Sequence, residues 1–176
     1  MRQLMLLFAI VSPVVAMLAT REIPDQLRGK WIVKKVIPTS TISCWGDRES
    51  KQLVGTEIEY TADSLRWRDK TTAHPDVTVS EITAEQFHSE NSGGAADSQV
   101  SFRQLGILSA SATQISLGHQ AANITGGTTE IPGDGILIKS RNTIIVSVCN
   151  VYFEAVRSTS SAKSATATRD DHPQRN

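Results

Sequence analysis

The chain has 176 residues, and its 18 lysines and arginines balance its 18 aspartates and glutamates. Nothing in the sequence concentrates the positive charge into a stripe. This argues against a nucleic-acid partner, because a phosphate-binding surface needs a local excess of lysine and arginine. The length suits one ordinary domain with a single core.

The first 19 residues have the pattern of a secretory signal peptide. Arg2 precedes a mainly apolar stretch, and small residues at Ala16 and Ala19 offer two positions where a signal peptidase would cut. The apolar stretch is shorter than the roughly 20 residues of a membrane-spanning helix, and no second one follows. We therefore predict a secreted or periplasmic protein with no membrane span after cleavage.

The other end of the chain has a different composition. Residues 158–176 are rich in serine, threonine and alanine and contain no large apolar side chain. Such a segment cannot bury enough surface to offset the entropy of ordering it, so we predict a disordered tail. The predicted folded domain spans residues 22–157.

Within that domain the hydrophobic residues mostly alternate with polar ones between turn-forming clusters, which is typical of short strands. We predict strands over residues 30–37, 57–60, 64–68, 76–82, 99–104, 113–117, 135–139, 143–148 and 151–157. Two short helices are expected, after Asp47 and over residues 84–89, the second with Thr83 and Gln86 as a capping box.

These strands form a meander with mainly short connections. A meander must protect its edges, and closing into a barrel removes them. We predict an all-β fold, a small antiparallel up-and-down barrel of about eight strands, with a two-sheet β-sandwich as the alternative. If the first and last strands pair antiparallel, Trp31 lies near Arg157 and Ile37 near Val151. Cys44 and Cys149 then lie at the same end of the barrel.

Gly29, Trp31 and Arg157 together resemble the lipocalins and the wider calycin group. In these proteins a G-x-W motif opens the first strand of the barrel, and a basic residue near the end of the chain stacks on the tryptophan. The resemblance implies a lipocalin-like barrel in which the Arg157 guanidinium covers the Trp31 indole and closes one end.

Cys44 and Cys149 are the two cysteines of the chain. In an oxidising compartment we expect them to form a disulfide, which would stabilise the fold by several kcal/mol in the chain-entropy model. A redox-active or metal-binding pair is the alternative, but neither cysteine has a C-x-x-C neighbour or a nearby histidine.

The sequence carries no pattern of catalytic or cofactor chemistry. The histidines share no metal-ligand spacing, no serine has an identifiable base, and no glycine-rich stretch has the context of a phosphate loop. Glu57 and Glu59 share one face of a strand, which indicates a solvated outer face. We expect no enzyme activity, no cofactor and no metal.

A binding function is the remaining expectation. The first hypothesis is a small apolar ligand held inside the barrel, since a barrel of about eight strands has room for one small ligand or for packed side chains. The predicted lining residues are Tyr60, Leu65, Trp67, Val79, Phe102 and Ile115, with Trp45 either over the open mouth or against the disulfide. The alternative is a solid barrel that binds or inhibits a secreted macromolecule through the loops at 40–53 and 118–134.

Overall fold

A computed structural model describes residues 18–20, 22–39, 43, 45–68, 70–73, 76–91, 100–118 and 132–159. Its strands are β1 (Leu18–Thr20), β2 (Gly29–Ile37), β3 (Glu57–Tyr60), β4 (Ser64–Trp67), β5 (Lys70–Ala73), β6 (Asp76–Thr83), β7 (Ser111–Gly118), β8 (Gly135–Ser140), β9 (Thr143–Val148) and β10 (Val151–Arg157). Its helices are α1 (Asp47–Lys51), α2 (Ala84–Glu90) and α3 (Phe102–Leu105).

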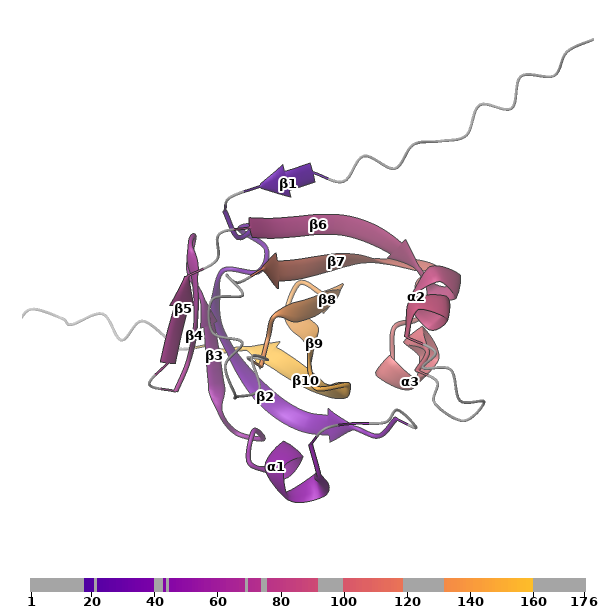
Figure 1. Cartoon of the computed structure of the whole chain (residues 1–176), viewed down its shortest axis with the longest axis horizontal. Helices are drawn as coiled ribbons and strands as arrows, with labels where there is room; N and C mark the ends of the chain where they lie inside the picture. Colours follow the sequence, from indigo (N-terminus) through magenta and orange to yellow (C-terminus); the bar gives the residue numbers. More distant parts are fainter. Residues whose placement is uncertain are drawn as a thin grey trace, which may run out of the picture.

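The strands form one antiparallel sheet in the order β1-β6-β7-β8-β9-β10-β2-β3-β4-β5. Figure 1 shows this sheet curling around, with β6 and β7 on one side and β2 to β5 on the other. The predicted all-β, barrel-like fold is confirmed. The sheet is open, however, because β1 and β5 are its two ends and do not pair with one another.

The pairing of the first predicted strand with the last is also confirmed. In the antiparallel ladder between β2 and β10, Trp31 lies opposite Arg157 and Ile37 lies opposite Tyr152. The register shifts between Glu154 and Ala155, which is the position of a β-bulge. The ladder brings residues from the two ends of the folded domain into direct contact.

Two hairpins follow the sequence pattern closely. Strands β3 and β4 pair with Tyr60 opposite Leu65, and both side chains are buried. Strands β9 and β10 are joined by Cys149 and Asn150, whose φ angles are 54° and 60°. Positive φ at both central residues is the requirement of a type I′ turn, the connection that suits the twist of a tight hairpin.

The inner side of the curled sheet is filled by one hydrophobic cluster, here called the inner cluster. Its largest fully buried side chains include Trp31, Tyr60 and Phe153. Strand β10 shows the alternation that builds it, because Val151, Phe153 and Ala155 belong to the cluster while the residues between them point the other way.

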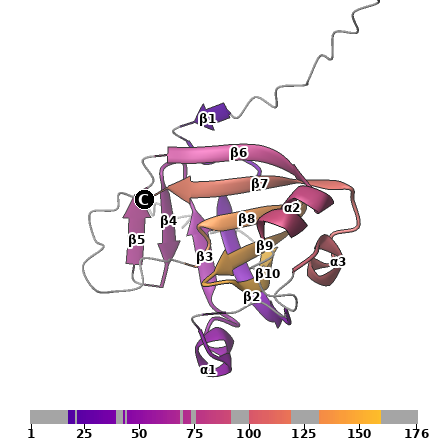
Figure 2. The same ribbon diagram turned by 45° about the vertical axis from the view of Figure 1, so that its right-hand side comes forward.

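A second cluster, here called the helix-side cluster, lies on the opposite face of the sheet. It joins Ile145 and Tyr152 of the sheet to Phe87 of α2 and Phe102 of α3. The ring centroids of Phe87 and Phe102 are 5.2 Å apart. Figure 2 shows α2 over the ends of β8 and β9 with α3 beside it, on the side away from β3 to β5.

Local capping explains both helices. Thr83 and Gln86 form the predicted capping box of α2. Ser101 and Gln104 form a second capping box, and Gly106 ends α3 with a φ of 71°. The predicted strand over residues 99–104 is therefore wrong, because this capping pattern starts a helix.

Strands β1 and β5 complete the sheet and were not expected from the sequence. β5 is four residues long and has one partner, β4. No helix in the described ranges is long and apolar enough to cross a membrane. The predicted tail from residue 160 onward, and the signal peptide up to residue 17, lie outside the described residues.

Candidate functional site

Gly29, Trp31 and Arg157 close one end of the curled sheet. The Arg157 guanidinium carbon lies 4.2 Å from the Trp31 ring centroid. Its Nη1 and Nη2 donate hydrogen bonds to the carbonyl oxygens of Arg28 and Gln26, at 2.7 and 2.6 Å. Gly29 has a φ of 112°, and a Cβ there would lie 3.1 Å from Nη1 of Arg157. The predicted stacking of this arginine on the tryptophan is confirmed.

The segment before β2 completes this closed end. The Trp31 indole Nε1 donates a hydrogen bond of 2.7 Å to the carbonyl oxygen of Leu27. Ile23 and Leu27 are fully buried in the inner cluster. Both polar and apolar contacts therefore tie residues 23–28 beneath the tryptophan.

The residues predicted to line a ligand cavity are only partly brought together. Tyr60, Leu65 and Ile115 are at most 1% exposed and belong to the packed inner cluster. Trp67 and Val79 are partly buried against that cluster from β4 and β6. These five side chains share the inner side of the sheet, where they contribute to a filled core.

Phe102 does not join the other predicted lining residues. It lies on α3 in the helix-side cluster, with its ring against Phe87. Its assignment to the inner lining followed from the predicted strand over residues 99–104. Because the segment is helical and packs on the opposite face, Phe102 cannot face the same interior as Tyr60.

Trp45 lies elsewhere, beside a hollow of about 360 Å³ at the end of the sheet opposite the Trp31–Arg157 contact. We call this hollow the Trp45 groove. It is lined by Val36, Ile37, Pro38, Thr39, Ser43, Trp45, Gly46, Asp47, Ser50, Lys51, Asn150 and Val151. The volume falls in the range of sites that bind small molecules.

The groove combines an apolar base with a charged rim. Val36, Trp45 and Val151 pack in or against the inner cluster, so their surfaces toward the groove are backed by the core. Asp47 and Lys51 stand on the exposed face of α1, with 3.8 Å between Oδ2 and Nζ. An apolar base with a polar rim is the composition of a recognition surface.

Hydrogen bonds hold the groove to the β9–β10 turn. The Ser43 hydroxyl donates to the carbonyl oxygen of Cys149 at 2.8 Å, and the Trp45 amide donates to the Ser43 hydroxyl oxygen at 3.0 Å. The two residues on either side of Cys44 in the chain are thereby fixed beside Cys149. Trp45 is consequently anchored through its backbone as well as its ring.

Cys149 is 5% exposed and is not a free thiol. Cys44, its predicted partner, lies outside the described residues. The hydrogen bond from Ser43 to Cys149 nevertheless places the chain next to Cys44 at the turn that contains Cys149.

A second, larger hollow lies at the Trp31–Arg157 end. It has a volume of about 870 Å³ and is lined by Asp25, Gln26, Ile138, Ser140, Arg141, Asn142 and Arg157. Ile138 is its single large apolar side chain, and Arg157 already uses its guanidinium on Trp31 and on two carbonyl oxygens. This hollow lacks the aromatic base that distinguishes the Trp45 groove.

Three titratable groups of the packed fold have altered acidity. Burial, and then the charge of Asp134, raise the pKa of the Tyr60 hydroxyl well above its ordinary value. Burial raises the pKa of Tyr152 to about 12. The hydrogen bond from Lys139 to Glu154, followed by the charges of Lys139 and Lys35, lowers the pKa of the Glu154 carboxyl.

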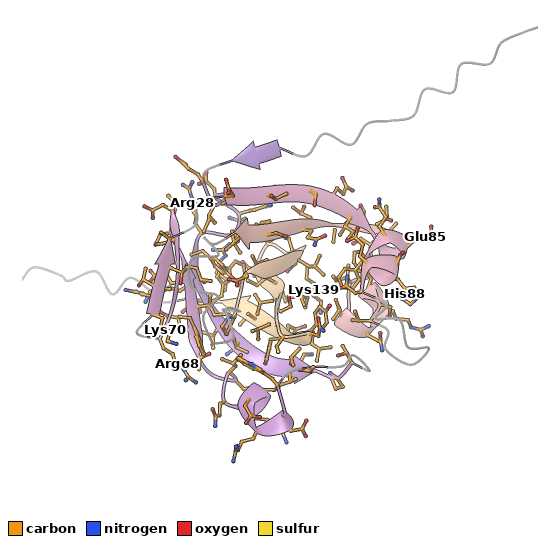
Figure 3. The ribbon with its side chains drawn as sticks, viewed as in Figure 1. Arg28, Arg68, Lys70, Glu85, His88 and Lys139 are labelled. Atoms are coloured by element: carbon orange, nitrogen blue, oxygen red, sulfur yellow. The ribbon has the colours of Figure 1, made fainter. Side chains whose placement is uncertain are left out.

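The charged outer surface is arranged as ion pairs between neighbouring strands. Glu57 pairs with Lys30 at 2.7 Å, and Glu59 pairs with Arg66, so both glutamates face outward as predicted. Figure 3 shows Arg68 and Lys70 at the β4–β5 side, and Glu85 and His88 at α2 on the opposite side.

No group of three or more metal-ligating side chains occurs among the residues that the structure describes. Of the four histidines, His88 is described; its Nδ1 lies 3.4 Å from the Val100 carbonyl oxygen. The other three lie outside the described ranges.

Sequence reasoning identified Trp45 and, through the loop at 40–53, the groove residues Ser43, Gly46, Asp47, Ser50 and Lys51. It did not place Asn150 and Val151, at the β9–β10 turn, in the contact surface. Asp47 and Lys51 lie on α1 as an i, i+4 pair. Their meeting with Val36 and Val151 depends on how α1 packs, which no local pattern specifies.

Comparisons with known proteins add no relative. No protein-family model matches the chain, and no curated protein or solved structure matches it. The resemblance to the lipocalins accordingly stands on Gly29, Trp31 and Arg157.

Proposed function

We propose that this chain is an exported, non-enzymatic binding domain with a solid interior, which recognises another secreted protein through the Trp45 groove. One observation carries the proposal. The inner side of the sheet is occupied by side chains that are almost completely buried, whereas the aromatic-based hollow at Trp45 is open to the surface. The geometry thus favours surface recognition over a ligand enclosed in the barrel.

The Trp45 groove suits a short protruding segment of a partner that carries an apolar side chain. Tryptophan at the base of a groove supplies a large contact area with few rotatable bonds. Asp47 and Lys51 at the rim offer one charge of each sign, which would orient a partner segment rather than attract one net charge.

We also propose that a disulfide between Cys44 and Cys149 fixes the groove in advance of binding. It would join the segment containing Ser43 and Trp45 covalently to the β9–β10 turn, which the hydrogen bond from Ser43 already contacts. A preorganised groove binds more tightly because less conformational entropy is lost on association. Peptide mass mapping of the oxidised protein should recover residues 44 and 149 in one cross-linked fragment.

The binding proposal is tested by site-specific photo-crosslinking of the full chain exported by its own host. A photoreactive residue replaces Lys51 at the groove rim in one variant and Arg103 on the exposed side of α3 in the control. One defined secreted protein should be captured from position 51 and not from position 103. The adduct should disappear when Trp45→Ala is added, and remain with Trp67→Phe.

Two results would contradict the proposal. Equal adducts from both positions would mean that the groove has no special role. Native mass spectrometry that finds a small apolar molecule on the exported chain, retained in the Trp45→Ala variant, would support the enclosed-ligand hypothesis instead.

A further inference from the structure

The two edges of the sheet are protected in different ways. β5 is short and polar, and Lys70 stands at its start. A short edge strand with a lysine discourages pairing with another chain. β6 is twice as long, with eight residues, and its stretch from Val77 to Val79 carries no charge, lysine or proline.

β1 pairs with the outer edge of β6 and covers it. Leu18 lies opposite Val79, Ala19 opposite Thr78 and Thr20 opposite Val77, in an antiparallel register. Figures 1 and 2 both show β1 alongside β6, at the end of the sheet away from β5. Three residues of β1 thus satisfy the backbone of the uncharged part of this edge.

This strand coincides with the region in which the predicted signal peptide would be cut. A cut after Ala19 would leave the mature chain only Thr20 of the three β1 residues. A cut after Ala16 would leave all three. The choice of processing site therefore decides whether the mature protein keeps the cover of its β6 edge.

The residues before each candidate bond also differ. Signal peptidases require small side chains one and three residues before the cut. These positions hold Ala16 and Val14 for one bond, and Ala19 and Met17 for the other. Valine is smaller than methionine, so substrate chemistry favours the same bond as the strand pairing.

We infer that the signal peptide is removed between Ala16 and Met17, and that Leu18–Thr20 stay in the mature protein as the strand that protects the β6 edge. The inference rests on the proposed export of the chain. It assigns the N-terminal extension a structural role after export, which is to prevent pairing between exposed sheet edges.

The test is the intact mass and N-terminal sequence of the full chain after export by its host. The mature protein should begin at Met17. In a matched pair of variants, Ala16→Phe should abolish this product, because phenylalanine is too bulky for the position before the cut. Ala19→Phe should leave the cut in place and change the mass only by the substitution.

A mature chain that begins at Thr20 would overturn the inference, and so would loss of processing in Ala19→Phe but not in Ala16→Phe. A chain exported with its first 16 residues intact would overturn it as well. Hydrogen exchange gives a second readout on the processed protein, in which amides of Val77–Val79 should exchange more slowly than those of β5. None of these outcomes depends on the Trp45 groove, so crosslinking at position 51 tests the binding function separately.

Discussion

The guanidinium of Arg157 lies over the indole of Trp31, at 4.2 Å from the ring centroid, and joins β10 to β2. The same guanidinium donates to two carbonyl oxygens of the segment before β2. One side chain therefore joins the C-terminal strand to β2 and to the segment directly before β2.

Replacing Arg157 with alanine should lower the free energy of unfolding by about 2–4 kcal/mol, from the lost cation–π contact and two hydrogen bonds. The free energy of unfolding of Arg157→Lys should lie between those of the wild type and Arg157→Ala, because lysine keeps the charge but lacks the planar guanidinium. Arg141→Ala, at an exposed turn, is the control and should change stability by less than about 0.5 kcal/mol. Urea unfolding measures the stability of all three variants. Equal losses of stability in Arg157→Ala and Arg141→Ala would contradict the stabilising role of Arg157.

Gly133 and Gly55 form a matched pair for backbone strain. Both have positive φ, 99° and 87°, but a Cβ at Gly133 would lie 2.5 Å from the Tyr60 hydroxyl, whereas one at Gly55 meets nothing within 4 Å. Gly55→Ala should cost about 1–2 kcal/mol from φ alone. Gly133→Ala should cost about 1–3 kcal/mol more, from overpacking.

A double-mutant cycle on thermal or urea unfolding isolates the clash at Gly133. Removing the hydroxyl with Tyr60→Phe should recover part of the extra cost of Gly133→Ala. The hydroxyl contact would be ruled out as the cause if the two glycine variants were equally stable, or if Tyr60→Phe gave no recovery.

Tyr60 and Tyr152 should make the protein sensitive to alkali. Their pKa values are raised by burial, to about 12 for Tyr152 and well above the ordinary value for Tyr60. Above about pH 10 the unfolded chain releases these protons while the native chain retains them, so the free energy of unfolding falls as pH rises.

The measurement is urea unfolding between about pH 9 and about pH 12 for the wild type and the Tyr60→Phe variant. The variant should lose part of the alkaline slope. It should also lose about 1 kcal/mol at neutral pH, because the Tyr60 hydroxyl donates to the Gly133 carbonyl oxygen at 3.1 Å. An identical alkaline slope in both proteins would show that Tyr60 titrates normally in the native state.

Glu154 should make the stability of the protein depend on pH at the acid end of the range. Its carboxylate accepts a hydrogen bond of 2.7 Å from Lys139 and lies 3.5 Å from Lys35, and these contacts lower its pKa. The stability from this group is present above about pH 4.5 and is lost as pH falls through the lowered native pKa.

Glu154→Gln should therefore reduce the free energy of unfolding at neutral pH and flatten its fall toward acid. Glu57→Gln is the matched control, since Glu57 also accepts a bond of 2.7 Å from a lysine but both side chains are about 40% exposed. Glu57→Gln should lower the free energy of unfolding by less than Glu154→Gln does, within the range of about 0–1 kcal/mol for exposed ion pairs. A loss at Glu57 equal to that at Glu154 would contradict the role given to burial.

Most strands could be predicted because each carries its own signal. Alternation of apolar and polar residues identified β2, β6, β9 and β10, and the turn residues between them located the hairpins. α3 was missed although Ser101, Gln104 and Gly106 form a capping pattern, because Val100 and Phe102 also alternate as in a strand. β5 could not be predicted because it contains no large hydrophobic residue that would reveal an alternating pattern.

The candidate site was harder to predict, for a physical reason. Trp45 was singled out as an aromatic residue beside a cysteine, and five of the other six predicted lining residues do share the inner side of the sheet. Whether that side is hollow or filled depends on how the side chains of all strands interlock, which the alternation pattern does not contain.

The sequence by itself determined most of the strands, the hairpins and the pairing of Trp31 with Arg157, because these follow from periodicity, turn chemistry and the antiparallel register of β2 and β10. Only the tertiary structure decided that Tyr60 packs in a filled interior, that α1 forms one wall of the Trp45 groove, and that β1 covers β6. Each of these depends on contacts between segments whose local patterns are independent of one another, so the three-dimensional packing alone brings them together.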